Sequence, residues 1–151
     1  AFLHLRRLLV ENADRLGDIH YHDWTLYALS RMSGQRWIFD PRPSINYRQH
    51  EGNDTGARSG LSALRTRLSL IRSGWYGRQI TAVANLCSAL PVADVDQIAS
   101  RAVAEFLWLR REAENRRPVT KLNLARWVFI NGRRRLSDRI MLGTAALMGY
   151  L

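Results

Sequence analysis

Two stretches of the sequence carry most of its candidate chemistry. Residues 22–24 read His-Asp-Trp, and residues 44–57 read Ser-Ile-Asn-Tyr-Arg-Gln-His-Glu-Gly-Asn-Asp-Thr-Gly-Ala. The Tyr-Arg-Gln-His run is polar and cationic, and the asparagine and glycines behind it favour turns. Such a loop suits the approach to an anionic ligand better than it suits packing in a core. We therefore expect the rest of the chain to be organised around these two stretches.

Around these stretches the pattern is mostly helical. Apolar residues at helical spacing predict a helix over residues 1–13 and a second helix that begins around Asp23 and ends before Gly34. The buried side of the second helix is expected to be Trp24, Tyr27, Ala28 and Met32. Residues 36–40 and 45–50 read as two short strands separated by a proline-induced bend.

Beyond residue 57 the sequence predicts helices throughout. One helix ends at Pro91, the next is expected to have Asp94 as its N-cap, and the last two are expected to be capped by Thr120 and Ser137. A tryptophan set is assigned to the core: Trp75, Trp108 and Trp127. The expected fold is mainly α, with a small α/β segment in residues 1–57 followed by a basic helical bundle in residues 58–151.

The charge is divided unevenly along the chain. Residues 1–57 hold seven Arg against seven Asp and Glu, so the formal net charge of +10 arises entirely in residues 58–151. All four histidines lie in the neutral part. A basic surface can attract nucleic acid, anionic lipid or phosphorylated substrates, and charge alone does not choose among them. Cys87 is the one cysteine, which excludes an internal disulfide and favours a reducing compartment. It falls on the apolar side of a predicted helix and has no histidine near it in sequence, so we expect a packed thiol and not a reactive one.

No apolar run reaches the roughly 18–20 residues that span a bilayer. The first residues combine Arg and His with apolar side chains in an amphipathic pattern, which is unlike a signal peptide. The chain opens in the middle of a predicted helix without an initiator Met. These features suggest a fragment of a longer protein.

Asp23 is the strongest candidate for a catalytic residue. At the start of a helix, a carboxylate meets unpaired backbone N–H groups and the positive end of the helix dipole, which favour its ionised form. An ionised carboxylate can take a proton from an attacking hydroxyl. The alternative is that Asp23 is only an N-cap. The neighbours His22 and Trp24 favour a site, because an indole beside a carboxylate suits the C–H face and the hydroxyls of a sugar.

Arg48 and His50 form a second candidate pair. Two residues apart on a predicted strand, they point to the same face and make a cationic pair. His50 could bind a metal or contact a phosphate, and the alternative is an ordinary hydrogen-bonded histidine. Asn53 is most simply a turn residue.

At these residues the sequence resembles the C-terminal part of bacterial family 2 glycosyltransferases, especially the rhamnosyltransferase-like group. That group carries His-Asp-Trp, a Gly-containing stretch, and then Tyr-Arg-Gln-His-Gly-x-Asn-x-x-Gly-Ala. The matching residues here are His22, Asp23, Trp24, Gly34, Tyr47, Arg48, Gln49, His50, Gly52, Asn53, Gly56 and Ala57. Glu51 departs from the pattern as an extra residue before Gly52, and Thr25 replaces a frequent aromatic.

The resemblance implies a division of the chain into two parts. Residues 1–57 would be the acceptor-side end of a GT-A catalytic domain whose nucleotide-binding half is absent, and residues 58–151 a basic helical C-terminal region. The metal-binding Asp-x-Asp motif of such enzymes belongs to the absent half. Asp94-Val95-Asp96 has that pattern, but it opens a helix late in the chain. The fragment alone is therefore expected to be inactive.

The resemblance also implies roles for the candidate residues. Asp23 would be the base of an inverting sugar transfer, and His22, Trp24, Arg48 and Asn53 would bind substrate. His50 would help to hold a divalent metal, Mg²⁺ or Mn²⁺, in the longer enzyme.

The implied partners are a nucleotide-sugar donor and a glycan or lipid-diphosphate acceptor in cell-surface glycan synthesis. The implied location is the cytoplasm, with peripheral contact at the inner face of the membrane as a further option. The alternative function is a basic helical module that binds nucleic acid or another protein. Nucleic acid is the less expected partner, because the Arg residues are spread over several helices.

Overall fold

The computed structural model describes residues 2–36, 38, 42, 61–115, 117–132 and 136–151, with the side chains of residues 61–64 left aside. Within these residues the chain forms seven α-helices, two 3₁₀ turns and no strand. The helices are α1 (Phe2–Glu11), α2 (His22–Met32), α3 (Leu61–Arg72), α4 (Trp75–Ser88), α5 (Gln97–Glu114), α6 (Pro118–Asn131) and α7 (Leu136–Met148). The 3₁₀ turns are η1 (Ala13–Arg15) and η2 (Val92–Asp94).

The mainly α expectation is confirmed for the described part of the chain. The expected strand over residues 45–50 lies outside the described residues. Of residues 36–40 only Arg36 and Ile38 are described, and neither is in a strand. The GT-A segment and the division at residue 57 therefore stay predictions.

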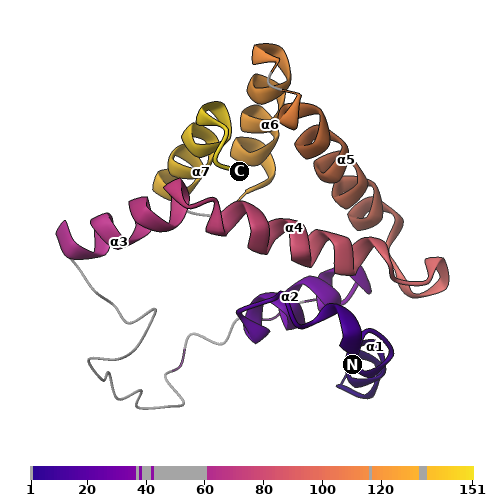
Figure 1. Cartoon of the computed structure of the whole chain (residues 1–151). Helices are drawn as coiled ribbons and strands as arrows, with labels where there is room; N and C mark the ends of the chain where they lie inside the picture. The colour runs from indigo at the N-terminus through magenta and orange to yellow at the C-terminus, as the bar shows by residue number, and fades with distance from the viewer. Residues whose placement is uncertain (1, 37, 39–41, 43–60, 116, 133–135) are drawn as a thin grey trace.

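Helix α4 lies across the middle of the molecule, between two groups of helices (Figure 1). On one side α1 and α2 pack below it, and on the other α5, α6 and α7 rise above it. Each side has its own hydrophobic cluster. The first joins α1, α2 and α4 through Leu8, Leu29, Met32, Leu86, Cys87 and Leu90. The second joins the remaining helices to α4 through residues that include Ile71, Ala84, Phe106, Leu109, Leu124, Val128 and Leu142.

The C-terminus closes the second cluster. Leu151 is buried, and its backbone crosses α4 at Gly77. A Cβ placed on Gly77 would come within 3.0 Å of the Leu151 carbonyl carbon, so the missing side chain allows this close crossing.

Three expected helix caps are wrong. The N-cap of α5 is Asp96, whose Oδ1 accepts a hydrogen bond from the Ala99 N–H at 2.9 Å. Asp94 lies instead in η2, because the chain makes a 3₁₀ turn after Pro91 before the helix can start. Helix α6 begins at Pro118, a residue preorganised for the first helical position, so Thr120 is already inside it. Ser137 is likewise inside α7.

The expected buried faces also need correction. Tyr27 and Trp108 are 45% and 58% exposed, although both were expected in the core. Helix α2 buries Thr25, Leu29, Ser30 and Met32. It packs against α1 as well as α4, and that arrangement turns its smaller side chains inward.

Cys87 is a packed thiol, as expected for a cysteine on the apolar side of a helix. It is buried in the cluster shared by α1, α2 and α4. Burial raises the pKa of the Cys87 thiol from 9.0 to about 11, because the apolar surroundings disfavour the thiolate.

Leu124→Ala should destabilise the fold strongly. Leu124 is fully buried on α6, and removing its side chain leaves a cavity that costs about 2–5 kcal/mol. The matched control is Leu122→Ala on the same helix, where the side chain is 59% exposed and the expected change is within about 0.5 kcal/mol. Urea unfolding followed by circular dichroism measures both, and equal losses in the two variants would contradict this packing.

The Cys87 thiol should react slowly with iodoacetamide at pH 8 while the protein is folded, and rapidly in urea. Because the folded pKa of about 11 lies above the ordinary value of 9.0, the unfolded chain loses this proton at a lower pH than the folded chain does. The full contribution of the buried thiol to the free energy of unfolding is therefore present below pH 9. It is lost as the pH rises from 9 towards 11. Mass spectrometry of the alkylated protein checks the rate, and fast labelling of the folded chain would show an accessible thiol.

Candidate functional site

The His-Asp-Trp stretch forms the first turn of α2. Tyr21 occupies the N-cap position with extended backbone, and α2 begins at His22. Asp23 is therefore the second helical residue and not the N-cap. Its carboxylate lies in the turn where backbone N–H groups lack helical partners and where the dipole favours negative charge. His22 and Asp23 are exposed, so both can meet a ligand from solvent.

Trp24 joins an aromatic cluster built from both α2 and α4. Its ring lies nearly parallel to that of Tyr76, with centroids 6.4 Å apart and an interplanar angle of 22°. Trp75 contacts Trp24, Tyr21 and His20 edge to face, at centroid distances of 6.3, 5.6 and 5.9 Å. Such arrangements are favoured by the ring quadrupoles and fix the orientation of each ring. The start of α2 is thus held against the start of α4.

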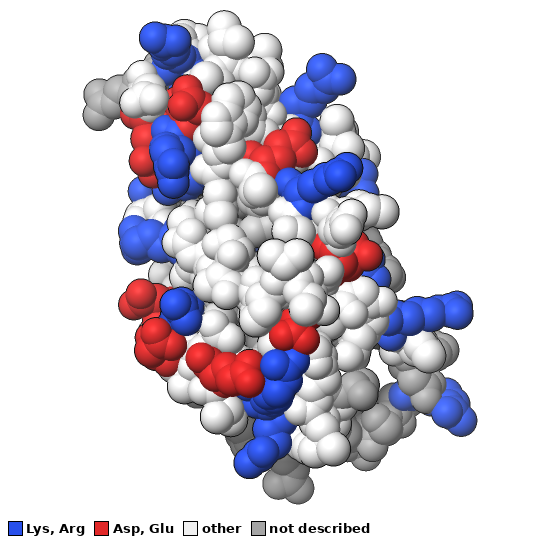
Figure 2. Space-filling view, turned by 90° about the vertical axis from the view of Figure 1, so that its right-hand side faces the viewer, with Lys and Arg blue, Asp and Glu red and all other residues white. Residues whose placement is uncertain are grey.

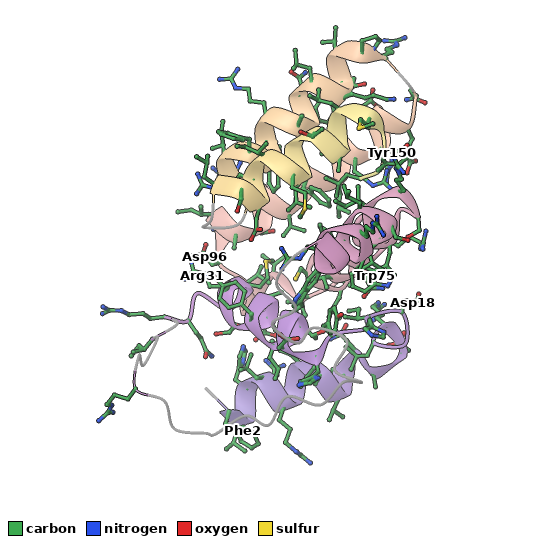
Figure 3. All side chains as sticks on the ribbon, turned by 90° about the vertical axis from the view of Figure 1, so that its left-hand side faces the viewer. Phe2, Asp18, Arg31, Trp75, Asp96 and Tyr150 are labelled. Atoms are coloured by element: carbon green, nitrogen blue, oxygen red, sulfur yellow. The ribbon has the colours of Figure 1, made fainter. Side chains whose placement is uncertain are left out.

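A buried side-chain amide fixes the segment that leads into the site. Gln79 of α4 is 8% exposed, and its Nε2 donates to the Asp18 carbonyl at 2.9 Å. Its Oε1 accepts from the His20 N–H at 2.7 Å. One amide therefore satisfies two backbone groups of the loop between η1 and α2. Figure 3 shows Asp18 and Trp75 together at this edge of the molecule.

Thr25 also supports the first turn of α2. Its side chain is 4% exposed, and its hydroxyl donates to the Tyr21 carbonyl at 3.4 Å. A small polar residue fits at this buried position.

The other predicted site residues lie outside the described part of the chain. These are Arg48, His50 and Asn53. No distance from Asp23 to His50 is therefore defined, and the shared cleft between them stays a prediction.

One shallow hollow of about 280 Å³ lies away from the His-Asp-Trp stretch. It is lined by His4, Ser33, Gly34, Ala93, Asp94, Val95 and Asp96. Its polar groups are already engaged: His4 Nε2 lies 3.0 Å from Ser33 Oγ, and Arg7 donates to Asp94 at 2.6 Å. The Asp96 carboxylate caps α5. This Asp-x-Asp pattern therefore serves the helix start and an ion pair.

Within the described residues, no group of three or more His, Cys, Asp or Glu side chains is arranged to hold a metal ion. In that part of the chain, no helix is both long enough and apolar enough to cross a membrane.

Comparison with known proteins gives one informative relative. The chain is 36% identical over 83 residues to a dTDP-rhamnosyl transferase, RfbG, of Shigella flexneri. The match covers 55% of this chain and 29% of that protein, so it spans less than a third of the relative's length. No model of a known protein family matches, and no solved structure matches. The relative supports a relationship to glycosyltransferases.

Sequence reasoning missed three residues that build this region. Trp75 was expected in the core, and Tyr76 and Gln79 were not singled out. A signal for Gln79 was present, because it lies at i−4 and i−7 from Val83 and Leu86, on an otherwise apolar helix face. A polar residue on such a face needs a hydrogen-bond partner, here the backbone of Asp18 and His20.

Gln79→Leu should loosen the start of α2. The change keeps the approximate side-chain volume but leaves a carbonyl and an N–H of the loop unpaired, which costs roughly 1–3 kcal/mol. The control is Asn85→Leu, which also replaces a side-chain amide by leucine, at an exposed position of the same helix. We expect faster amide-hydrogen exchange at His20 in the Gln79 variant alone. Equal stability and equal exchange in the two variants would show that the amide does not hold this loop.

Proposed function

We propose that this chain is the acceptor-side part of an inverting glycosyltransferase. The complete enzyme would move a sugar from a nucleotide-sugar to a polysaccharide or lipid-linked acceptor in cell-surface glycan synthesis. The observation that carries the proposal is the exposed Asp23 in the first turn of α2, next to an aromatic cluster. The similarity to a dTDP-rhamnosyl transferase supports the same chemistry.

Asp23 is assigned the role of general base. Its exposure in the first turn of α2 leaves room for an acceptor hydroxyl. As the hydroxyl oxygen attacks the anomeric carbon, the carboxylate takes its proton, and the bond from that carbon to the diphosphate breaks. Attack opposite the leaving group inverts the anomeric configuration.

Trp24 and Trp75 are assigned to the acceptor pocket. Both indoles are half-buried and oriented by their ring contacts, so they can present a fixed apolar surface to the C–H face of a sugar. His22 is exposed beside them and can hydrogen-bond a sugar hydroxyl. This pocket would select the acceptor.

Arg48 and His50 are assigned to the leaving diphosphate, and Asn53 to substrate binding, as the resemblance implies. A cationic pair would offset the negative charge that develops as the bond to the sugar breaks. The implied metal, Mg²⁺ or Mn²⁺, would supply similar stabilisation. The described residues do not provide a metal site, and we assign the metal no step.

The complete enzyme would act in the cytoplasm, with a nucleotide-sugar as donor and a glycan or lipid-diphosphate as acceptor. Nucleic acid is not proposed as a partner. Figure 2 shows acidic and basic side chains interspersed on one face of the molecule. A surface that tracks a phosphate backbone would concentrate basic residues in a stripe.

Asp23→Asn should slow transfer strongly without unfolding the protein. In the complete enzyme, which joins these residues to a nucleotide-binding domain, loss of the general base should lower kcat about 100-fold or more. Asp14→Asn is the control, since Asp14 is also an exposed acid, lies in η1, and should leave turnover within about twofold.

Sugar transfer from a dTDP-sugar is measured by chromatography of the product, and circular dichroism confirms the fold. Near-normal turnover of the Asp23 variant would remove this residue from the mechanism. Measurable turnover by the 151 residues alone would contradict the need for a separate donor-binding half.

A further inference from the structure

The outer side of α7 is apolar and uncharged. Four large apolar residues share this side at helical spacing, and all are between 47% and 62% exposed: Leu136, Ile140, Leu147 and Met148. Ser137 and Thr144 complete this exposed stripe. The opposite side of α7 is buried in the core through Leu142, Ala145 and Ala146. The helix is therefore apolar on both sides, and only one side is covered.

Helix α6 repeats this arrangement. Leu124, Ala125 and Val128 are buried, whereas Val119, Leu122, Phe129 and Ile130 are between 41% and 68% exposed on the opposite side. Arg126 is the charged residue in the middle of that exposed stripe. A surface helix normally presents polar residues to solvent, so apolar residues on both sides indicate a second partner.

The two exposed stripes lie on the same side of the α6–α7 pair. The two helices run side by side (Figure 1). Gly143 of α7 faces the Ala125 carbonyl of α6. Counted at 100° per residue from that contact, Leu122 and Phe129 turn to the same side as Ile140 and Leu147. They form one apolar surface, here called the hairpin face. It comprises Val119, Leu122, Phe129, Ile130, Leu136, Ile140, Leu147 and Met148.

This region of the chain is strongly basic. Residues 117–151 contain seven Arg or Lys and a single acidic residue, Asp138. An apolar face on a cationic helix pair is the pattern of segments that lie in the interface of an anionic membrane. The apolar side chains enter the boundary between headgroups and acyl chains, and the cations attract the anionic headgroups.

We propose that the hairpin face docks on the surface of an anionic lipid bilayer, with α6 and α7 lying in the plane of the interface. The proposal is independent of the sugar-transfer chemistry. Charge argues against the two other occupants. A second copy of the chain would bring two basic hairpins face to face, and nucleic acid would meet an outer side of α7 on which the described residues carry no charge.

The test is co-sedimentation with vesicles of phosphatidylcholine alone and of phosphatidylcholine mixed with phosphatidylglycerol. The chain should bind the mixed vesicles, and binding should fall as the salt concentration rises. Ile140→Glu combined with Leu147→Glu should lower binding about tenfold or more, because the apolar contact is lost and the charge is reduced.

The matched control is Val92→Glu combined with Ile98→Glu. Both residues are exposed, and they lie in η2 and the first turn of α5, away from the α5–α6 connection. This control adds the same two negative charges to the molecule as the hairpin variant does, but it leaves the hairpin face unchanged. The control should therefore bind the mixed vesicles nearly as well as the parent chain. Ile140→Ser with Leu147→Ser provides a version of the test without any change of charge, and thermal melts check that every variant is folded.

Three results would overturn the proposal. The first is no binding to the mixed vesicles, or equal binding to phosphatidylcholine alone. The second is equal loss of binding in the hairpin variants and the control. The third is a parent chain that sediments as a dimer in analytical ultracentrifugation and becomes monomeric on Ile140→Glu with Leu147→Glu, which would assign the face to self-association.

Discussion

The packing of α4 between two hydrophobic clusters is the constraint on which the rest of the structure depends. Ala84 faces the cluster shared with α5, α6 and α7, whereas Leu86 and Cys87 face the cluster shared with α1 and α2. Because one helix serves both, movement of α4 would disturb both cores together. Val103 of α5 packs against both clusters and reinforces this coupling. The C-terminal end of the chain also packs on α4, where the Leu151 backbone crosses the helix at Gly77.

The same helix also positions the candidate site. Gln79 binds the loop before α2 through two backbone hydrogen bonds, and Trp75 and Tyr76 orient Trp24. Asp23 is exposed, yet the turn that carries it is fixed by contacts from a helix more than fifty residues later in the sequence. This separation suits catalysis, since a general base must be accessible to substrate while its backbone is held still.

The two ends of the molecule have different surface chemistry. The α2 end combines an exposed carboxylate, a histidine and half-buried indoles, which suits a hydroxylated ligand. The α6–α7 end combines apolar side chains with basic residues and has no comparable polar cluster among its described residues. The proposed sugar transfer and the proposed membrane docking therefore use separate surfaces. An acceptor linked to a lipid would give a reason for one protein to carry both.

The sequence by itself determined the helical character of the described part and the position of His-Asp-Trp at a helix start, because apolar periodicity and turn residues are local signals. It also identified Cys87 as a packed thiol. It placed the caps at Asp94, Thr120 and Ser137 wrongly, since the 3₁₀ turn after Pro91 and the starts at Pro118 and Leu136 shift each boundary by two or more residues. Only the tertiary structure decided that Tyr27 and Trp108 face solvent and that Gln79 and Trp75 build the candidate site. Those outcomes depend on which helices pack against one another. Contacts between residues more than fifty positions apart are not encoded in the local spacing of apolar residues, so the sequence pattern does not predict them.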